Sequence, residues 1–493
     1  MTTLSFTAFD LLLPSFYIFS EYILRALMVL VVLFRKADRP TVATGWIVMV
    51  LAQPIVGAIL YFSLGEVRFG TRRIARHRRI LARIDRPAIH RHRDPAVYAP
   101  KLPPAAHGLS LVTDAISHGL VCGGNRVELF GETEQSIRAM IEAIDAAREH
   151  CHALFYIWLD DGTGRLVAEA LERAAARGVA CRVLLDAVGS KAFLRSETCR
   201  SLRERGVSVV AALPVSLPRM LLSRIDLRNH RKLLVCDGVV GFTGSQNIAD
   251  AAFAPKAKFA PWVDCLVRLE GPAVRELQMI FVVDWTLDAP DEGGDLDVDA
   301  LLAIEPPPQA DGVPTQLVAS GPNYQQDAIT QLIQAFVHSS RRELVLTTPY
   351  FVPDQATLTN LMVAARRGVE VTLVVPARND SVVVGLASRS LFGPLLEAGV
   401  RIEEFHGGLL HAKTVTIDRE IGVVMSANLD LRSFDLNFEC GALVYDAGFA
   451  ATLRELQESY RRRSTPVPLE RWRDRSARLR LAQGAASVLS PLI

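Results

Sequence analysis

The sequence predicts an α/β protein of two homologous halves, whose mixed sheets pack about a pseudo-twofold axis behind an N-terminal transmembrane hairpin of two helices. Three observations lead to this fold class. Two long apolar runs open the chain. Short apolar runs then alternate with amphipathic ones, as in sheets that helices cover on both faces. Finally, one polar block occurs twice with the same internal spacing, which indicates an internal duplication.

Length and composition limit the possible functions. A chain of 493 residues suggests two or three units, and a formal net charge of +2 argues against a polycation that binds nucleic acid. The seven cysteines are scattered and show no CxxC or Cys/His spacing typical of zinc sites. We therefore expect reduced, buried thiols in a cytosolic compartment, and no metal ion.

Residues 1–66 are expected to form the transmembrane hairpin. The first apolar run, 11–34, contains Glu21 and Arg25, which lie four residues apart on one helix face and can pair. The second run, 42–64, carries no charge. Each run is long enough to cross a hydrocarbon core of ~30 Å. A pair of buried core helices is the alternative, but charge-free runs of ~20 residues are uncommon in soluble cores.

Residues 67–107 are expected to be a basic juxtamembrane linker. By the positive-inside rule, this cluster stays in the cytoplasm, so the N-terminus and the region after the linker are both expected to face the cytoplasm. The cluster also suits anionic lipid headgroups, at about 1 kcal/mol for each basic residue near the surface. A solvated linker that only obeys the charge rule is the alternative. The arginines are Arg68, Arg72, Arg73, Arg76, Arg78, Arg79, Arg83, Arg86, Arg91 and Arg93.

Two similar halves follow, at 108–288 and 316–463, with a connector rich in Pro, Asp and Gly at 289–315. In the first half we expect strands at 124–130, 153–158, 179–185 and 207–213, and helices at 133–149 and 164–177. In the second half we expect strands at 341–346 and 369–375, around a helix. The basic amphipathic tail, 464–493, is expected to lie either on a membrane surface or on the protein.

The repeated polar block carries the predicted chemistry. In the first half it consists of His230, Lys232, Asp237, Ser245 and Asn247. In the second half it consists of His411, Lys413, Asp418, Ser426 and Asn428. On a strand, residues two apart share a face, so each His and Lys can enter one pocket. The imidazole can attack phosphorus or move a proton, and we expect the Lys, Ser and Asn side chains to bind phosphate oxygens.

The two aspartates of the blocks differ from the other polar residues. Asp237 and Asp418 each follow their histidine by an odd number of positions, so on a regular strand they face away from the pocket. We expect them to support the structure of the site. A metal site is a weaker alternative for the blocks as a whole, because each supplies one imidazole and lysine is not a usual ligand.

The two blocks are expected to be two halves of one site. One histidine attacks and the other protonates the leaving oxygen, because one role needs neutral imidazole and the other imidazolium. The residues alone leave open which histidine has which role. Each imidazole also needs an acceptor that orients it. We predict Asp264 for His230 and Glu439 for His411, although each carboxylate could instead belong to a structural salt bridge.

These blocks resemble the hallmark of the phospholipase D superfamily, the duplicated HxKxxxxD motif, and within it the chain is similar to the bacterial cardiolipin synthases. The similarity spans nearly the whole chain and includes the hairpin, Pro349 to Asp354 and the closing Ser490 to Leu492. It implies a phosphohistidine intermediate, no metal and no cofactor. It also implies that His230 is the nucleophile and His411 the general acid, and it places Asp237 and Asp418 in the catalytic motif.

The resemblance further implies transphosphatidylation in the bacterial inner membrane, where the chain would be a multi-pass protein that contacts anionic lipids. Two phosphatidylglycerol molecules would give cardiolipin and glycerol through a phosphatidyl-histidine. Hydrolysis to phosphatidic acid is one alternative. A phosphodiesterase or nuclease is another, but the net charge and the apolar runs argue against nucleic acid as a partner. A catalytically silent scaffold is the third. The oligomeric state is left open.

One residue departs from the family pattern. The second block has Met425 where the family usually has glycine, as the first block has Gly244. Glycine permits close backbone approach and unusual dihedral angles. The sequence predicts extra bulk beside the second half-site, with an effect on the pocket or on the acceptor.

Overall fold

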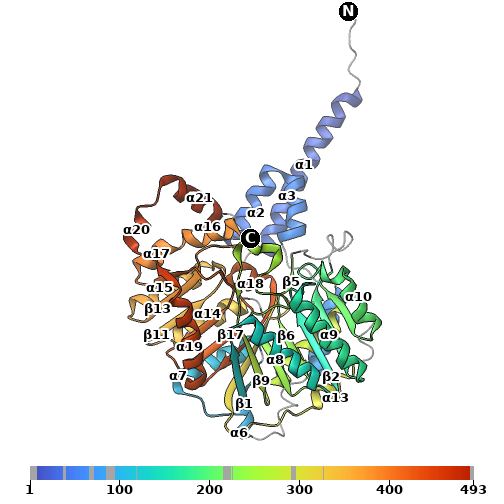
Figure 1. The fold of residues 1–493 in the computed structure, drawn as a ribbon. Coiled ribbons are helices and arrows are strands. Elements are labelled where there is room, and N and C mark those ends of the chain that lie inside the picture. Colours follow the sequence, from blue (N-terminus) through green and yellow to red (C-terminus); the bar gives the residue numbers. More distant parts are fainter. Residues whose placement is uncertain are drawn as a thin grey trace, which may run out of the picture. The chain divides into compact units, whose positions relative to one another are not determined.

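The computed structural model describes residues 8–36, 40–65, 71–84, 95–117, 119–214, 224, 226–289, 296–325 and 327–488. These residues form two compact units. One contains the N-terminal helices up to Arg73, and the other contains the remainder from Ile74 apart from a short segment that ends at Asp226. Figure 1 shows the elements of both units.

The N-terminal unit is helical. It contains α1 (Ala8–Arg35), α2 (Pro40–Ala52), α3 (Pro54–Leu60) and a π-helix (Tyr61–Gly65). The second apolar run is divided at Gln53, because Pro54 starts a new helix. The predicted pair is confirmed, with Arg25 Nη2 and Glu21 Oε1 2.8 Å apart. Over the described residues, no helix combines the length and the apolar character needed to cross a bilayer.

Three helices lie in the region predicted as a linker: α4 (Thr71–Arg83), α6 (Pro95–Tyr98) and α7 (Pro104–Ser117). Two arginines of α4 contact other elements of the larger unit, to which they belong. Arg76 donates to the carbonyl oxygen of Leu287 at 3.3 Å, and Arg83 forms an ion pair of 2.5 Å with Asp299. Part of this basic cluster is therefore structural. The predictions for Arg68, Arg86, Arg91 and Arg93 lie outside the described residues.

The larger unit, which contains both polar blocks and is called the catalytic unit below, is built on a sheet of 16 strands, counted over the described residues. The first half contributes β1 (Val121–Phe130), β2 (His150–Phe155), β3 (Ala180–Asp186), β4 (Ser208–Ala212), β6 (Leu233–Cys236), β7 (Val240–Gly244) and β9 (Leu266–Glu270). The second half contributes β10 (Val313–Ser320), β11 (Glu343–Thr347), β13 (Glu370–Pro376), β14 (Arg401–Phe405), β16 (Thr414–Ile417), β17 (Ile421–Met425) and β19 (Asn437–Val444). β20 (Ser464–Pro466) lies at one edge, and β5 (Arg228–Asn229) pairs with β19 beside the main path.

The strand order reveals the pseudo-twofold relation. From the junction of β1 and β10, the first half runs β1-β9-β7-β6-β2-β3-β4, and the second runs β10-β19-β17-β16-β11-β13-β14. Each half mixes parallel and antiparallel pairs in the same places. The predicted α/β fold of two homologous halves is confirmed.

Helices fill the expected positions in both halves. The first half has α8 (Thr133–Ala146), α9 (Gly162–Ala176), α10 (Glu197–Glu204) and α12 (Val274–Asp288). The second half has α14 (Ala328–Ser339), α15 (Gln355–Arg366), α16 (Val382–Ser390), α17 (Phe392–Glu397), α18 (Leu431–Asp435) and α19 (Ala447–Arg461). The predicted connector contains α13 (Val298–Ala303), while 290–295 lie outside the described residues. The tail contains α20 (Leu469–Arg473) and α21 (Ala477–Val488), and 489–493 lie outside.

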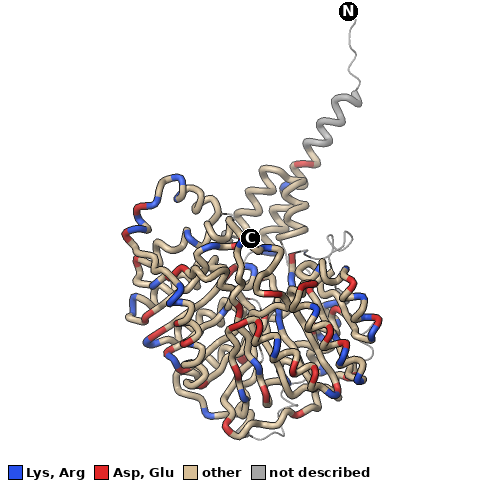
Figure 2. The backbone as a smooth tube through the Cα atoms, viewed as in Figure 1, with Lys and Arg blue, Asp and Glu red and all other residues tan. Residues whose placement is uncertain are grey.

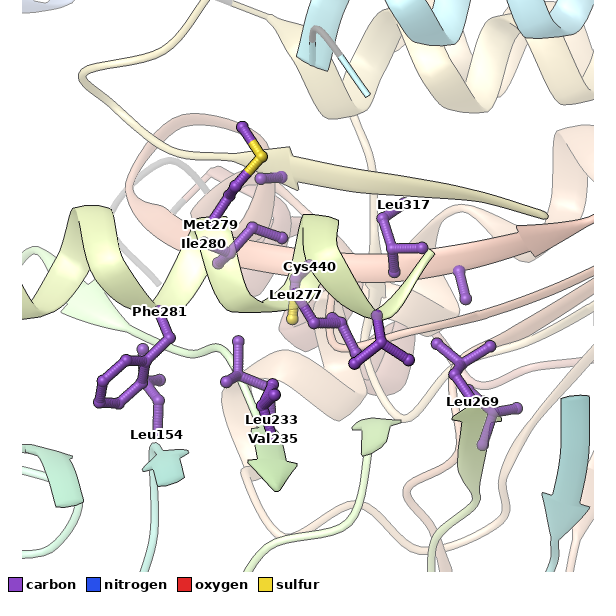
Figure 3. Close-up of a cluster of buried hydrophobic side chains, with 14 of the residues drawn as sticks. Leu154, Leu233, Val235, Leu269, Leu277, Met279, Ile280, Phe281, Leu317 and Cys440 are labelled. Carbon is purple, nitrogen blue, oxygen red and sulfur yellow. The ribbon is translucent and has the colours of Figure 1, made fainter. Parts of the chain in front are cut away.

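Helix α12 joins the cores of the two halves. Its side chains are buried almost all round, which is unusual for a helix that covers a sheet. In Figure 3, Leu277 and Phe281 of α12 belong to one apolar cluster with Leu233 of the first half and with Leu317 and Cys440 of the second. Each such side chain contributes about 1.5–3 kcal/mol when fully buried. The two halves therefore share a core and hold each other in a fixed relation.

The residue that departs from the family pattern is matched by a change on the neighbouring strand. In the first half Gly244 pairs with Leu266, and a Cβ on Gly244 would lie 2.5 Å from the carbonyl oxygen of Cys265. In the second half Met425 pairs with Gly441, where a Cβ would lie 2.6 Å from the Cβ of Met425. In the second half, the glycine of this pair therefore lies on the neighbouring strand β19 and not on β17. Met425 lies in the apolar core of its half.

This exchange predicts the behaviour of a glycine restored at position 425. Met425→Gly should lower the free energy of unfolding by about 2–5 kcal/mol, because it leaves a cavity opposite another glycine. The double variant Met425→Gly with Gly441→Leu recreates the pair of the first half and should recover most of this loss. Denaturant unfolding of the three proteins tests the prediction, and a double variant less stable than Met425→Gly would contradict it.

Candidate active site

Short strands exchanged between the halves hold the two histidines. β5 runs parallel to β19 of the second half, and the backbone N–H of His230 donates to the carbonyl oxygen of Phe438 at 2.9 Å. In the mirror arrangement, β15 (Leu409–Leu410) runs parallel to β8 (Trp262–Val263) of the first half. The backbone N–H of His411 donates to the carbonyl oxygen of Val263 at 2.8 Å. Each histidine is thus attached to the strand of the other half.

The histidine–carboxylate pairs are crossed between the halves as a result. His230 Nδ1 lies 2.9 Å from Glu439 Oε2, and His411 Nδ1 lies 2.6 Å from Asp264 Oδ1. The structure brings together all four predicted residues, but the predicted pairing of Asp264 with His230 and of Glu439 with His411 is wrong. The prediction joined each histidine to a carboxylate of its own half, whereas β5 and β15 carry the histidines across.

Burial and the neighbouring charges set the protonation states of His230 and Glu439. Burial lowers the pKa of His230 to about 4, although the neighbouring Glu439 carboxylate acts in the opposite direction. Burial alone would raise the pKa of Glu439, but His230 and Lys232 outweigh it and hold that pKa at about 2. At neutral pH the pair is therefore a neutral imidazole beside an ionised carboxylate. With Nδ1 directed at the carboxylate, Nε2 is the nitrogen that remains to act as nucleophile or base.

The two lysines are buried beside the histidines. Lys232 Nζ donates to the carbonyl oxygen of its own His230 at 2.6 Å, and Lys413 Nζ donates to that of His411 at 2.6 Å. Burial lowers the pKa of Lys232 to about 8 and that of Lys413 to about 7. Each lysine also lowers the pKa of the histidine of the other half, after the larger effect of burial. The two blocks therefore form one electrostatic site.

The second histidine differs from the first in its ring contacts. His411 Nε2 lies 2.9 Å from Lys413 Nζ, in addition to the contact of Nδ1 with Asp264. Burial lowers the pKa of His411, and Asp264 opposes this effect. The buried Lys413 amine, whose pKa is about 7, provides a place from which a proton can pass to the ring or return from it.

The two serines lie behind the carboxylates. Ser426 Oγ donates to Glu439 Oε2 at 2.5 Å and accepts the backbone N–H of Cys440 at 2.9 Å. Ser245 Oγ accepts the backbone N–H of Cys265, the residue after Asp264, at 3.0 Å. These bonds fix the strands that present the carboxylates. Phosphate binding by the two hydroxyls stays a prediction, and it would require these bonds to be exchanged.

The two asparagines border the same site in different ways. Asn247 Oδ1 accepts the backbone N–H of Ile157 at 3.1 Å, which leaves its amide N–H groups for other partners. Asn428 Oδ1 is buried and has no hydrogen-bond partner within the described part of the chain. An unpartnered buried amide oxygen is costly unless a ligand donates to it. The second half-site therefore contains a ready acceptor for a hydroxyl group.

Asp237 and Asp418 take no part in the pocket. The carboxylate of Asp237 accepts the backbone N–H groups of the three residues 148–150 at 2.8–2.9 Å, where β2 begins. That of Asp418 accepts those of residues 341–343 at 2.7–2.9 Å, where β11 begins. Both follow the end of the strand that starts after the catalytic lysine. The structural role predicted from their odd spacing is observed, and their place among the catalytic residues is corrected.

Sequence reasoning missed two aromatic residues that border the site. The ring of Tyr156, which follows β2, meets the ring of His230 edge-on at 4.7 Å between centroids, and Lys232 Nζ lies 5.4 Å from the Tyr156 ring centre. The ring of Trp262 lies 4.7 Å from that of His411. Tyr156 immediately follows β2, and Trp262 is the first residue of β8.

Arg231 was also missed, although it stands between His230 and Lys232. It is fully buried and forms an ion pair of 2.6 Å with Asp284 of α12. Its other guanidinium nitrogens donate to the carbonyl oxygens of Glu439 at 3.1 Å and Ser320 at 2.8 Å. It therefore ties the loop of His230 to the strand that carries the carboxylate of His230. In the sequence, the available signal was Asp284, an acidic residue within the apolar run of α12.

Two imidazoles, two lysines and two carboxylates surround one site, an arrangement suited to an enzyme that transfers a phosphoryl-linked group. The family described as "Cardiolipin synthase, PLD-like domain" matches residues 140–285 and 332–461, and "Phospholipase_D-nuclease N-terminal" matches 24–66. The chain belongs to the family of phospholipase D-like cardiolipin synthases.

Curated relatives agree with this assignment, and one solved structure shares the fold. The chain is 36% identical to cardiolipin synthase A of Erwinia tasmaniensis and 35% identical to that of Yersinia pseudotuberculosis, in each case over 99% of this chain and 100% of the relative. Among solved structures, the phosphatidylserine synthase of Haemophilus influenzae has a similar fold, with a TM-score of 0.58 and 15% identity over 79% of this chain and 100% of that one.

The crossed pairs predict which variants behave alike. In a single-turnover assay with a radiolabelled phosphodiester, Glu439→Gln should fail in the same step as His230→Ala, and Asp264→Asn in the same step as His411→Ala. An amide cannot stabilise the imidazolium, so each rate should fall by up to about 10⁴-fold. If Glu439→Gln resembled His411→Ala instead, the crossed pairing would be wrong.

Arg231 should respond even to a conservative change. Arg231→Lys keeps the charge beside Asp284 but cannot reach both carbonyl oxygens, so we expect about a tenfold loss of turnover with little loss of folded protein. Arg367→Lys is the matched control, because Arg367 donates to the carbonyl oxygens of Val337 and Ser340 outside the site. Equal activity of the two variants would contradict a positioning role for Arg231.

Proposed function

We propose that the chain is a cardiolipin synthase that joins two phosphatidylglycerol molecules and releases glycerol. Two observations support the proposal. The chain matches proteins named cardiolipin synthase A from end to end. It also has both histidine–lysine pairs in one buried site, as transfer in two steps requires.

In the first proposed step, Nε2 of His230 attacks the phosphorus of one phosphatidylglycerol. The bond to the glycerol headgroup oxygen breaks, and His411 donates the proton that this oxygen takes away. Lys232 and Lys413 stabilise the charge that develops on the phosphoryl oxygens. Glu439 stabilises the positive charge that the substituted imidazole of His230 acquires.

In the second step, the primary hydroxyl of another phosphatidylglycerol attacks the phosphatidyl-histidine. His411, now neutral, takes the hydroxyl proton, and the bond between phosphorus and His230 breaks to give cardiolipin. The unpartnered Oδ1 of Asn428 is suited to accept a hydrogen bond from a glycerol hydroxyl. Asn247 is suited to bind a phosphoryl oxygen through its amide N–H groups.

We further propose that residues 1–66 form a membrane hairpin and that the chain is a multi-pass protein of the bacterial inner membrane with its catalytic region in the cytoplasm. Large apolar side chains of α1, α2 and α3 are exposed, among them Leu30, Val48 and Ile59. The N-terminal family match spans 24–66. Exposed arginines of α4 then suit the anionic headgroups of the same leaflet.

Purified protein in phosphatidylglycerol vesicles should form cardiolipin and an equal amount of free glycerol, measured by mass spectrometry. His411→Ala should slow both half-reactions by about 10²–10⁴-fold, because it lacks the acid and base. Phosphatidic acid as the main product would show that water is the acceptor. The absence of cardiolipin and glycerol from a folded sample would contradict the proposal.

A further inference from the structure

The C-terminal helix α21 exposes its apolar side. It packs along α16 and buries Gln483 and Ala486, with exposed fractions of 2% and 5%. The larger apolar residues Leu481 and Val488 face outward, with exposed fractions of 76% and 79%. A helix that only docks on a protein normally buries its largest apolar residues. Helix α21 is therefore rotated about its own axis so that its larger apolar residues face away from the protein, which is the opposite of what is expected for a helix docked in water.

A specific contact fixes this rotation. The guanidinium of Arg475 lies 3.7 Å above the ring of Trp472 in α20 and donates to Gln483 Oε1 at 2.5 Å. Ala486 meets Ala387 of α16 and Val352 in one small apolar cluster. Both contacts direct Leu481 and Val488 away from the protein, so their exposure is built into the packing of the tail.

The charge around the exposed apolar side is mainly positive. Residues 461–493 contain eight arginines and two acidic residues, and α21 contains no acid. Arg471, Arg478 and Arg480 are exposed around the apolar residues. Figure 2 shows basic residues along α20 and the start of α21, with acidic residues among them. An apolar stripe bordered by arginines is complementary to a bilayer surface that contains anionic lipids.

Two short strands connect this surface to the second half-site. Val382, the first residue of α16, is 73% exposed and belongs to the same pair of helices, α16 and α21. Helix α16 packs on β12 (Phe351–Val352), which pairs with β18 (Leu429–Asp430). Strand β18 begins immediately after Asn428 of the site. A bilayer held against α16 and α21 would thus lie over the elements that form the acceptor side.

We propose that α16 and α21 form a docking surface for an anionic bilayer, which holds the second half-site against the leaflet that supplies the acceptor lipid. The surface is independent of the hairpin in sequence and lies in the catalytic unit. The inference rests on the proposed action on membrane phosphatidylglycerol, and it assigns a second membrane contact to the chain.

The test uses the full-length protein in vesicles of phosphatidylglycerol and phosphatidylethanolamine. All seven native cysteines are buried, so one introduced cysteine can carry an environment-sensitive fluorophore. Leu481→Cys is the test position, and Leu166→Cys, on the first half and 53% exposed, is the matched control. We expect quenching by lipids with a quencher on the acyl chain to be about threefold greater at position 481 than at 166. Equal quenching, as for a surface covered by protein or water, would overturn the proposal.

A label at Val48 of α2 separates this inference from the hairpin. Quenching at 48 but not at 481 would overturn the docking surface and leave the hairpin, whereas quenching at 481 alone would support the docking surface without the hairpin. The double variant Leu481→Glu with Val488→Glu should lower turnover on vesicles about fivefold and leave turnover of monomeric short-chain phosphatidylglycerol unchanged. An equal loss on both substrates would overturn the proposal.

Discussion

The exchange of β5 and β15 between the halves is the constraint on which the site depends. Each is a strand of two residues, yet each carries a histidine onto a strand of the other half, next to the carboxylate that orients it. Neither half can therefore assemble a histidine–carboxylate pair alone. The shared core around α12 fixes the halves, and the exchanged strands turn that fixed relation into the geometry of His230 and His411.

The two half-sites have the same plan and different details. Arg231 is buried behind His230, where the second block has Ala412, and only His411 has a lysine ammonium at its Nε2. Asn428 presents an unpartnered oxygen where Asn247 holds the backbone of Ile157. These differences fit a division of labour in which the first half is held rigid for attack and the second exchanges protons and receives an acceptor.

Much of this could be predicted from sequence, because periodicity and spacing are local properties. Repeated strand and helix patterns predicted the two halves, and the odd spacing of Asp237 and Asp418 predicted that they face away from the pocket. The carboxylate partners of His230 and His411 could not be predicted in this way, because the exchange of strands between the halves is a property of the tertiary structure. The same holds for Met425, whose bulk is matched by Gly441 on another strand. The hydrogen bonds of Ser245 and Ser426 to the strands that carry the carboxylates could not be predicted either, because a motif does not show them.

The central claim is that each histidine is coupled to the carboxylate of the other half. Double-mutant cycles in the free energy of unfolding, with His230→Ala, Glu439→Gln and Asp264→Asn, measure this coupling directly. The account predicts a coupling energy of about 0.5–3 kcal/mol between positions 230 and 439, and a value within about 0.5 kcal/mol of zero between 230 and 264. Strong coupling between 230 and 264, with none between 230 and 439, would contradict it.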